Sequence, residues 1–258
     1  MLGLGTTLAS IDSGQIYKEL SELDNYADLD IHFDFSTLTG AHGATVTAAT
    51  NLGAGGATNN INANDGTPLV DTTTLNKKSV AFDGTNDILS LASAYTTTSK
   101  ACTFFMVFYK TDTTNDIFVQ KANNNSDDMF KISGASNKTL IVAYAGDDTV
   151  SIVMNATDST TSWVMPVNVP VVLVIARNPS GNVYVYAMRD GDLVASKTTA
   201  TMQEGASFTL GAIGGSTATT QDWTGNIAEF GMYDAMLDSP KIKTLCRELS
   251  TKWGIGYV

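Results

Sequence analysis

Short strand-like segments recur from residue 79 to residue 233, and they constrain the fold more than any other feature. Each is rich in β-branched or aromatic residues, and turn signals such as SGN, DGD, GDD and GG separate them. No strand–helix–strand rhythm interrupts the series, which argues against a parallel α/β sheet. The pattern is typical of an all-β fold, a two-sheet sandwich or jelly roll. The predicted strands are residues 79–82, 88–91, 101–109, 116–120, 128–132, 139–143, 149–154, 169–177, 182–189, 193–198, 208–213 and 223–233.

The period changes after the last of these strands and predicts a C-terminal helix. Asp238 or Ser239 serves as its cap, and Pro240 takes an early position where the missing N–H costs nothing. Gly254 ends the helix. One apolar stripe follows the helical spacing: Ile242, Leu245, Cys246, Leu249 and Trp253.

The beginning of the chain, residues 1–28, is predicted to form an N-terminal arm with a short helix. Ser13 is a plausible cap, and Ile16, Leu20 and Leu23 follow at helical spacing. The main domain then spans residues 29–258.

The first strand of that domain is marked by strict alternation. Apolar side chains face one way, and the polar side chains of Asp30, His32 and Asp34 face the other. This pattern predicts a half-buried strand.

Residues 36–76 contain few large apolar side chains and many Gly, Ala, Thr and Asn. A stretch this long without structure is uncommon inside a compact domain. We expect a long surface loop or an extended arm that orders on contact with a partner.

Charge and hydropathy exclude several classes of partner. The net charge is −11 and only 16% of residues are charged, so the chain lacks the basic stripe that phosphate recognition needs. No apolar run approaches the ~18 residues of a membrane span. The first residues have no basic region of the kind that begins a signal peptide. The sequence therefore predicts no nucleic-acid partner, no membrane insertion and no export through a cleaved signal.

The two cysteines are too few for a disulfide framework. Cys102 lies in the apolar run ACTFFMVF, and Cys246 lies on the apolar face of the C-terminal helix. We expect both to be small buried hydrophobic residues, with a disulfide as the alternative.

Three motifs together resemble a known family. They are the turn FDG-x-x-D-x-L, the strand TFFMVFY, and the closing segment GNIAEFGMYDAMLDSPKIKTLCRELSTKWGI. The closing segment is similar to a G-x-I-x-E pattern followed by a capped helix ending in K-[WY]-G, here Lys252-Trp253-Gly254. Residues 29–258 thus resemble the concanavalin A-like, laminin-G-like jelly-roll modules.

The resemblance implies a fold more than a function, because this fold serves lectins, glycosidases, adhesion modules and virion proteins. The helix-capped variant resembles modules of tailed-phage structural proteins. It implies a virion location, with coat or tail subunits as partners and a tendency to form homo-oligomers.

The glutamates and histidines of the sequence do not occur in the arrangements that catalysis would need. Glycosidases on this fold use paired carboxylates, often E-x-D-x-x-E on one strand, and no such motif is present. Glu229 is the one glutamate on a good strand, and we expect it to be a structural hydrogen-bond partner near the helix. Neither His32 nor His42 accompanies a nucleophile elbow or a zinc-ligand cluster. The chain is therefore expected not to be an enzyme.

The turn after residue 82 is the candidate metal site. Asp83, Asn86 and Asp87 supply the hard oxygen ligands that calcium prefers, although their spacing is not that of an EF-hand. We expect a tight hairpin turn whose Asp and Asn side chains accept local backbone N–H groups and fix the register of the strands, with a calcium site or direct sugar contact as the alternatives. No other cofactor is expected.

Aromatic residues beside polar ones are the candidate glycan site. Trp163 near Pro166, and Trp223 directly after Asp222, are the most loop-like aromatic residues. Their rings could stack on a sugar while the carboxylate binds hydroxyls; the alternative is packing in the core or an interface.

Two functional hypotheses follow. The first is a non-enzymatic bacteriophage virion protein, either a capsid decoration or a tail or fibre component. The second is a carbohydrate-binding module for host cell-surface glycans, with or without calcium.

Overall fold

The computed structural model describes most of the domain. It covers residues 28–98, 101–113, 115–120, 129–133, 140–145, 148–153, 155–156, 164–189, 192–201, 209–215 and 222–255. The helix predicted in the N-terminal arm lies outside these residues.

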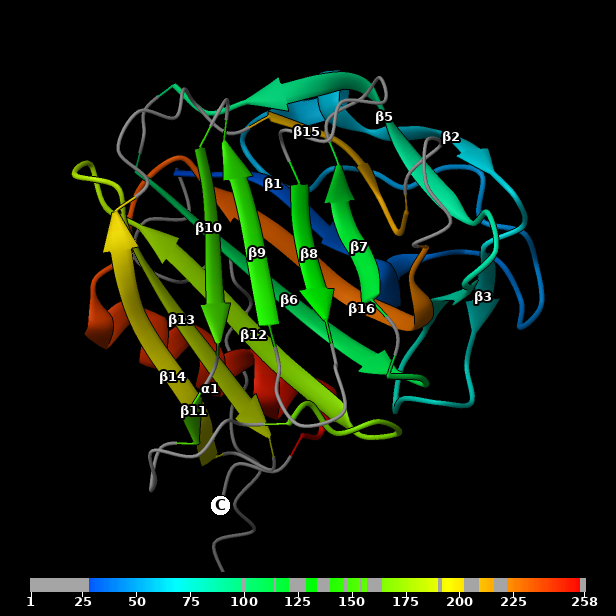
Figure 1. Ribbon diagram of the computed structural model, residues 1–258. Coiled ribbons are helices and arrows are strands. Elements are labelled where there is room, and N and C mark those ends of the chain that lie inside the picture. The colour runs from blue at the N-terminus through cyan, green and yellow to red at the C-terminus, as the bar shows by residue number, and fades with distance from the viewer. Residues whose placement is uncertain are drawn as a thin grey trace, which may run out of the picture.

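The strands form two antiparallel sheets, which confirms the predicted two-sheet sandwich (Figure 1). In the described part of the chain one sheet has nine strands and the other has seven. The nine-stranded sheet runs in the order β11 (Asn155–Ala156), β14 (Asp192–Thr201), β13 (Asn182–Arg189), β12 (Pro170–Arg177), β6 (Cys102–Lys110), β16 (Thr224–Tyr233), β4 (Ser79–Asp83), β3 (Leu69–Asp71), and β1 (Leu29–Asp34) also pairs with β16. The seven-stranded sheet runs in the order β10 (Asp148–Val153), β9 (Leu140–Ala145), β8 (Met129–Ser133), β7 (Asn115–Gln120), β15 (Thr209–Ile213), β5 (Ile88–Thr96), β2 (Ile61–Asp65).

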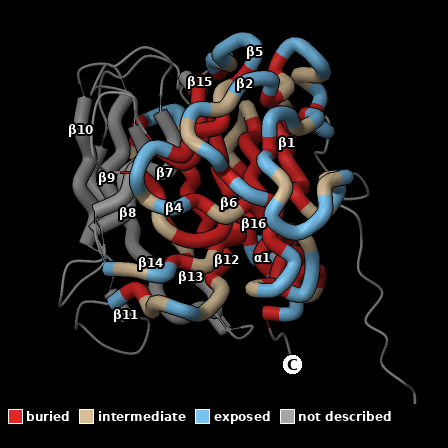
Figure 2. Tube along the Cα trace, turned by 90° about the vertical axis from the view of Figure 1, so that its right-hand side faces the viewer, coloured by how far each residue is buried: buried red, intermediate tan, exposed pale blue. Residues whose placement is uncertain are grey.

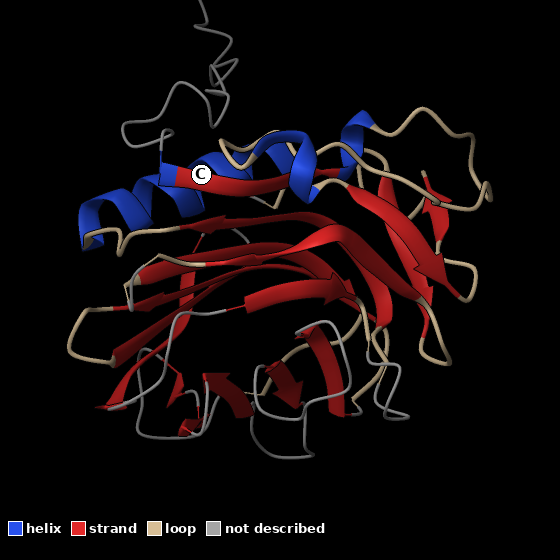
Figure 3. Cartoon of the chain, turned by 90° about the horizontal axis from the view of Figure 1, so that it is seen from above, coloured by secondary structure: helices blue, strands red, loops and turns tan. Residues whose placement is uncertain are grey.

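The nine-stranded sheet is the middle layer of the molecule, and the C-terminal helix covers its outer face (Figure 3). Strand β6 shows why its sequence is apolar at nearly every position. Phe104 and Met106 enter the core between the sheets, whereas Phe105 and Val107 pack toward the helix. A strand buried on both faces loses the polar alternation of a half-buried one. Two apolar clusters result, one between the two sheets and one between the nine-stranded sheet and α1, and strands β6 and β16 are buried along almost their whole length (Figure 2).

The helix α1 (Ser239–Trp253) begins and ends where its sequence predicts. The Asp238 carboxylate accepts the Lys241 N–H at 3.0 Å, and Gly254 takes the left-handed conformation with φ 65°. The apolar stripe of the helix is buried.

Strand β1 differs from the predicted half-buried strand, because both of its faces are covered. His32 and Asp34 are 5% and 9% exposed, although the alternation places them opposite the apolar side chains. Their face meets α1 rather than solvent, through the contact of Asp34 with Lys252. The polar residues thus face another element of the fold.

Residues 36–76 also differ from the expected long loop or arm. They include strands β2 and β3 and the 3₁₀ helix Gly56–Asn59, and a second short 3₁₀ helix, Phe35–Thr37, leads into them. Sparse apolar side chains anchor the segment, since Val46, Ile61 and Val70 are at most 3% exposed. The segment consists mainly of small residues and short turns. Its strands therefore have no apolar periodicity from which they could be predicted.

Part of this segment covers the outer edge of β1. The Leu52 N–H donates to the His32 carbonyl at 2.8 Å, and the Gly55 N–H donates to the Asp30 carbonyl at 2.9 Å. Asn51 holds the turn, because its Oδ1 accepts the His32 N–H at 2.7 Å. Gly53 passes so close that a Cβ there would lie 2.5 Å from the Asp30 carbonyl oxygen. Backbone groups that would otherwise form an open sheet edge are therefore paired.

Asp71 ties the same segment to β16. Its carboxylate accepts the Thr73 N–H at 2.7 Å and the Asn226 side-chain amide at 2.8 Å. Burial by itself would raise the pKa of Asp71, but hydrogen bonds from Thr74, Thr73 and Asn226 outweigh it and hold the pKa far below the usual 3.8.

This lowered pKa predicts an acid-dependent contribution to stability. A group whose pKa is lowered by folding stabilises the fold fully above its unfolded value, here 3.8, and the contribution is lost as pH falls below it. We expect Asp71→Asn to lower the free energy of unfolding by about 1–3 kcal/mol at neutral pH. The difference from wild type should shrink at acidic pH, measured by urea denaturation. A difference that does not change with pH would contradict this origin.

Both cysteines are free and buried. Burial raises the pKa of each thiol to about 12. This confirms the expected packing role for Cys102 and Cys246, and a disulfide between them is absent.

Candidate functional site

One end of the sandwich holds five of the residues that the sequence nominated for metal and glycan binding, namely Asp83, Asn86, Asp87, Asp222 and Trp223. Strand β4 ends there and β16 begins, and Asp83 pairs in register with Thr224. Gly84 lies against the same threonine, since a Cβ on Gly84 would be 2.1 Å from its Oγ1. The Asn168 N–H reaches the Lys110 carbonyl at 2.8 Å. We call this region, residues 64–67, 83–87, 110–112, 164–169 and 222–224, the loop end.

The turn from Asp83 to Asp87 is not the predicted hairpin. Strand β4 belongs to the nine-stranded sheet and β5 to the seven-stranded sheet, so the turn carries the chain from one sheet to the other. Asp87 stabilises this crossover: its two carboxylate oxygens accept the Thr67 N–H at 2.6 Å and the Asp83 N–H at 2.8 Å. Gly84 supplies the positive φ of 78° that the turn requires.

The electrostatics of this turn follow from the burial of Asp87, which is 2% exposed. Burial raises the pKa of Asp87, the two backbone hydrogen bonds oppose the rise, and the nearby Asp83 carboxylate adds to it. Asp83 and Asn86 are exposed. Ligands could reach these two side chains, whereas Asp87 serves the fold.

The predicted calcium site stays a prediction. Within the residues described, no group of three or more His, Cys, Asp or Glu side chains is placed to hold a metal ion. A site at the turn would need the Asn86 amide beside Asp83 and Asp87, and Asp87 already accepts two backbone N–H groups.

Trp223 is a core residue and cannot stack on a sugar. Its side chain is 0% exposed, and its ring meets the edge of Phe108 at 5.3 Å between centroids. The Lys110 ammonium lies 5.3 Å from the centre of the indole. Asp222 is buried beside it at 4% exposed, so the glycan role expected for this pair is wrong. The remaining aromatic candidate, Trp163, falls outside the described residues.

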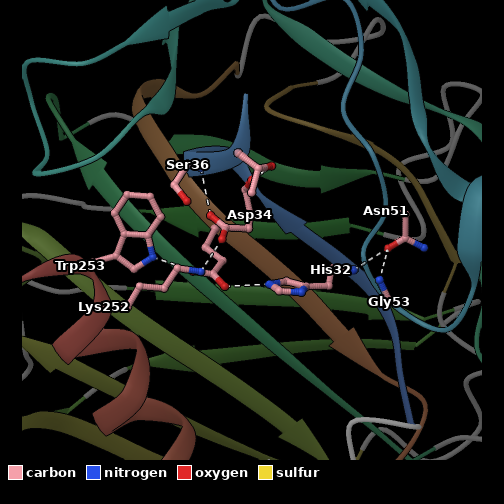
Figure 4. A network of polar contacts seen from close by, with 9 residues as sticks. His32, Asp34, Ser36, Asn51, Gly53, Lys252 and Trp253 are labelled. Carbon is pink, nitrogen blue, oxygen red and sulfur yellow. Dashed lines mark hydrogen bonds and ion pairs between the residues drawn. The ribbon is translucent and has the colours of Figure 1, made fainter. Parts of the chain in front are cut away.

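A second polar group lies between α1 and the nine-stranded sheet, and its side chains are buried (Figure 4). Strands β1 and β16 pair Asp34 with Glu229, and α1 brings Lys252 over both. The Lys252 Nζ lies 2.6 Å from Asp34 Oδ2 and 2.8 Å from Glu229 Oε2. Glu229 also contacts His32 Nε2 at 2.7 Å and accepts the Trp253 indole N–H at 2.6 Å. We call His32, Asp34, Glu229, Lys252 and Trp253 the buried cluster.

Mutual attraction keeps the charges of the buried cluster in place. Burial would lower the pKa of Lys252, but the Glu229 and Asp34 carboxylates outweigh it and raise that pKa above 10.5. Burial would likewise raise the pKa of Asp34, and the Lys252 ammonium outweighs it and holds that pKa below 3.8. The ion pair between Lys252 and Asp34 is therefore the ground state.

The buried cluster confirms the structural role expected for Glu229, a hydrogen-bond partner near the helix. It also includes His32 and Asp34, which the sequence placed on an outward face. The burial of His32 and Asp34 depends on the pairing of β1 with β16, two strands that are far apart in the sequence. The local sequence pattern does not reveal this pairing. Because Glu229 is 0% exposed, no substrate reaches it in the folded protein.

The fold is similar to those of solved lectin-like jelly-roll domains. Domain 4 of the arabinanase AbnA from Geobacillus stearothermophilus, solved with arabinotriose, aligns with a TM-score of 0.56 at 14% identity, over 84% of this chain and 98% of that domain. A heptameric SAP-like pentraxin from Limulus polyphemus aligns with a TM-score of 0.52 at 12% identity, over 65% of this chain and 81% of the pentraxin. The receptor-binding domain of botulinum neurotoxin type G aligns with a TM-score of 0.56 at 11% identity, over 85% of this chain but only 51% of that domain.

At these identities the likeness shows the fold alone: a jelly-roll β-sandwich of the lectin-like kind. No protein-family model and no curated protein matches the sequence. In the described part of the chain, no helix has the length and apolar character needed to cross a membrane.

Proposed function

We propose that this chain is a carbohydrate-binding domain without catalytic activity of its own. The observation that carries the proposal is the correspondence with the arabinanase domain, which aligns over 98% of its own length and was solved with arabinotriose. This domain provides a precedent for glycan binding by a jelly roll of this shape. The proposal needs a surface that is open to ligands and chemically suited to hydroxyl groups.

The loop end supplies such a surface. Asp83, Thr85 and Asn86 are exposed, and their carboxylate, hydroxyl and amide groups are the kinds that read sugar hydroxyls. Calcium could bridge the same oxygens to a glycan. We propose this loop end as the glycan site, and Trp163 stays the candidate stacking residue on the sequence alone.

The absence of catalysis is part of the proposal. Paired carboxylates for glycoside hydrolysis must flank the scissile bond. Asp34 and Glu229 form a close pair, but both are buried beneath α1. A virion setting remains a hypothesis that rests on the resemblance of the closing segment to phage modules. It is compatible with glycan binding, because a fibre tip can do both.

A glycan array probed with the purified chain tests the proposal. It is run with calcium and again with a chelator, and binding to at least one glycan class is expected. Asp83→Ala with Asn86→Ala, and separately Trp163→Ala, should each weaken that binding by about tenfold or more, which corresponds to about 1.4 kcal/mol.

The matched control is Lys243→Ala, an exposed substitution on α1, which should bind as wild type does. Loss of binding in the chelator alone would assign calcium to the site. A folded protein that binds no glycan under either condition would refute the proposal and leave the coat-building hypothesis.

A further inference from the structure

The buried cluster has the geometry of a reaction centre whose reactants are both parts of this chain. The Lys252 Nζ is in contact with the Asp34 carboxyl group, 2.6 Å from Oδ2. Oδ1 of the same carboxyl group accepts the Ser36 backbone N–H at 3.0 Å. The Glu229 carboxylate lies 2.8 Å from the same Nζ. The fold therefore holds four groups together: the Lys252 amine, the Asp34 carboxyl carbon, the Ser36 N–H that donates to one carboxyl oxygen, and the Glu229 carboxylate that can act as a base on the amine.

We infer that Asp34 and Lys252 condense into an amide bond, an intramolecular isopeptide cross-link, with Glu229 as the proton-transfer residue. Lys252 Nζ attacks Asp34 Cγ, and the C–N bond forms. Glu229 takes a proton from the nitrogen and delivers it to Oδ2, whose bond to Cγ breaks. The products are one amide and one water molecule, with no oxidant, reductant or co-reactant. This inference is independent of the proposed function.

Each partner has a defined task in this step. The Ser36 N–H stabilises the negative charge that develops on Oδ1 in the tetrahedral intermediate. Because Nζ and the carboxyl group are already in contact, the reaction is effectively unimolecular. Holding two reactants together in this way accounts for a large part of many rate accelerations. His32 holds the other oxygen of Glu229 at 2.7 Å, so the carboxylate remains oriented toward Lys252.

Burial favours the loss of the Lys252 and Asp34 charges, and the Glu229 carboxylate keeps its hydrogen bonds to His32 and Trp253 after the reaction. The ion pair costs desolvation of two charges, since the Lys252 side chain is 2% exposed and that of Asp34 is 8% exposed. Condensation replaces both charges by a neutral amide and releases water to bulk solvent. The amine and the acid must first be neutral, which transfer of one proton along the existing hydrogen bond achieves without changing the net charge. Because the ion pair is the ground state, the reaction is expected to follow folding slowly.

The cross-link would join the first strand of the sheet to the last helix. Asp34 and Lys252 are 218 residues apart, so the bond closes almost the whole domain into a ring. A ring of this size reduces the entropy of the unfolded chain much as a long-range disulfide does.

Intact-protein mass spectrometry of the full chain is the direct test, after purification and again after prolonged incubation. The expected mass is that of the sequence minus one water molecule. Tryptic mapping should find the peptide that contains Asp34 joined to the peptide that contains Lys252, with no cleavage after Lys252. A denaturing gel should show faster migration of the closed chain.

Variants separate the roles. Lys252→Arg and Asp34→Ala should retain the full sequence mass. Asp34→Asn should lose one ammonia molecule and give the same cross-linked product as wild type. Glu229→Gln should form the bond far more slowly, with near-native circular dichroism showing that its fold persists.

Lys110 and Asp112 provide an internal control. Their Nζ and Oδ1 atoms are 2.5 Å apart, but the Asp112 side chain is 30% exposed to water. No cross-link is expected there, and the peptide map distinguishes the two sites. A wild-type mass equal to the full sequence mass after incubation, with the Asp34 and Lys252 peptides both free, would overturn the inference whether or not any variant folds.

Discussion

Replacing Glu229 by alanine is expected to lower the free energy of unfolding by about 3–5 kcal/mol, a large part of the stability of an ordinary domain. Glu229 is the shared partner of His32, Lys252 and Trp253, and it is 0% exposed. Its removal leaves a buried ammonium with less compensation and a buried indole N–H without its acceptor. Both consequences are more costly than the loss of an exposed ion pair.

Chemical denaturation measures this effect, with two variants for comparison. Glu229→Gln keeps the shape and can still accept the Trp253 N–H, so its loss should be smaller than that of alanine. Asp83→Asn changes an exposed carboxylate and should alter stability by less than about 0.5 kcal/mol. Equal stabilities of the Glu229→Ala variant and the wild type would show that α1 docks without the buried cluster.

Replacing Trp223 by alanine is expected to cost about 3–5 kcal/mol of stability. The indole fills the core between the sheets against Phe108, and the resulting cavity lies next to the buried Lys110. The substitution therefore acts on the fold.

Glycan affinity and denaturation must be measured on the same Trp223→Ala preparation. Any loss of binding should match the fraction of unfolded protein, whereas Asp83→Ala with Asn86→Ala should lose binding at full stability. A stable Trp223→Ala protein that fails to bind would restore Trp223 to the glycan site and contradict its burial.

The strands and the C-terminal helix were predictable because their signals are local. Strands β6 and β12 can be predicted from the length of their apolar runs and from their β-branched and aromatic residues. Helix α1 can be predicted from its N-cap, its early proline and the helical spacing of its apolar residues. The two strands inside residues 36–76 gave no such signal. Strand β2 reads Ile-Asn-Ala-Asn-Asp and carries one buried apolar side chain, so only its pairing with β5 defines it.

The candidate site was predictable in part. The sequence nominated Asp83, Asn86 and Asp87 as a polar turn, and the structure places that turn at an end where several loops meet. The sequence could not show that this turn connects one sheet to the other. The two flanking strands have the same sequence pattern whichever sheet they join.

By itself, the sequence determined that the chain forms a jelly-roll sandwich closed by a helix. Alternation, capping and turn chemistry act over a few residues and can be read in order. Only the tertiary structure decided which polar residues are buried. Asp34 looks like a surface residue until Lys252, 218 positions away, is placed beside it. The physical reason is that a buried charge is tolerated only with its partner, and that partner comes from packing between distant elements.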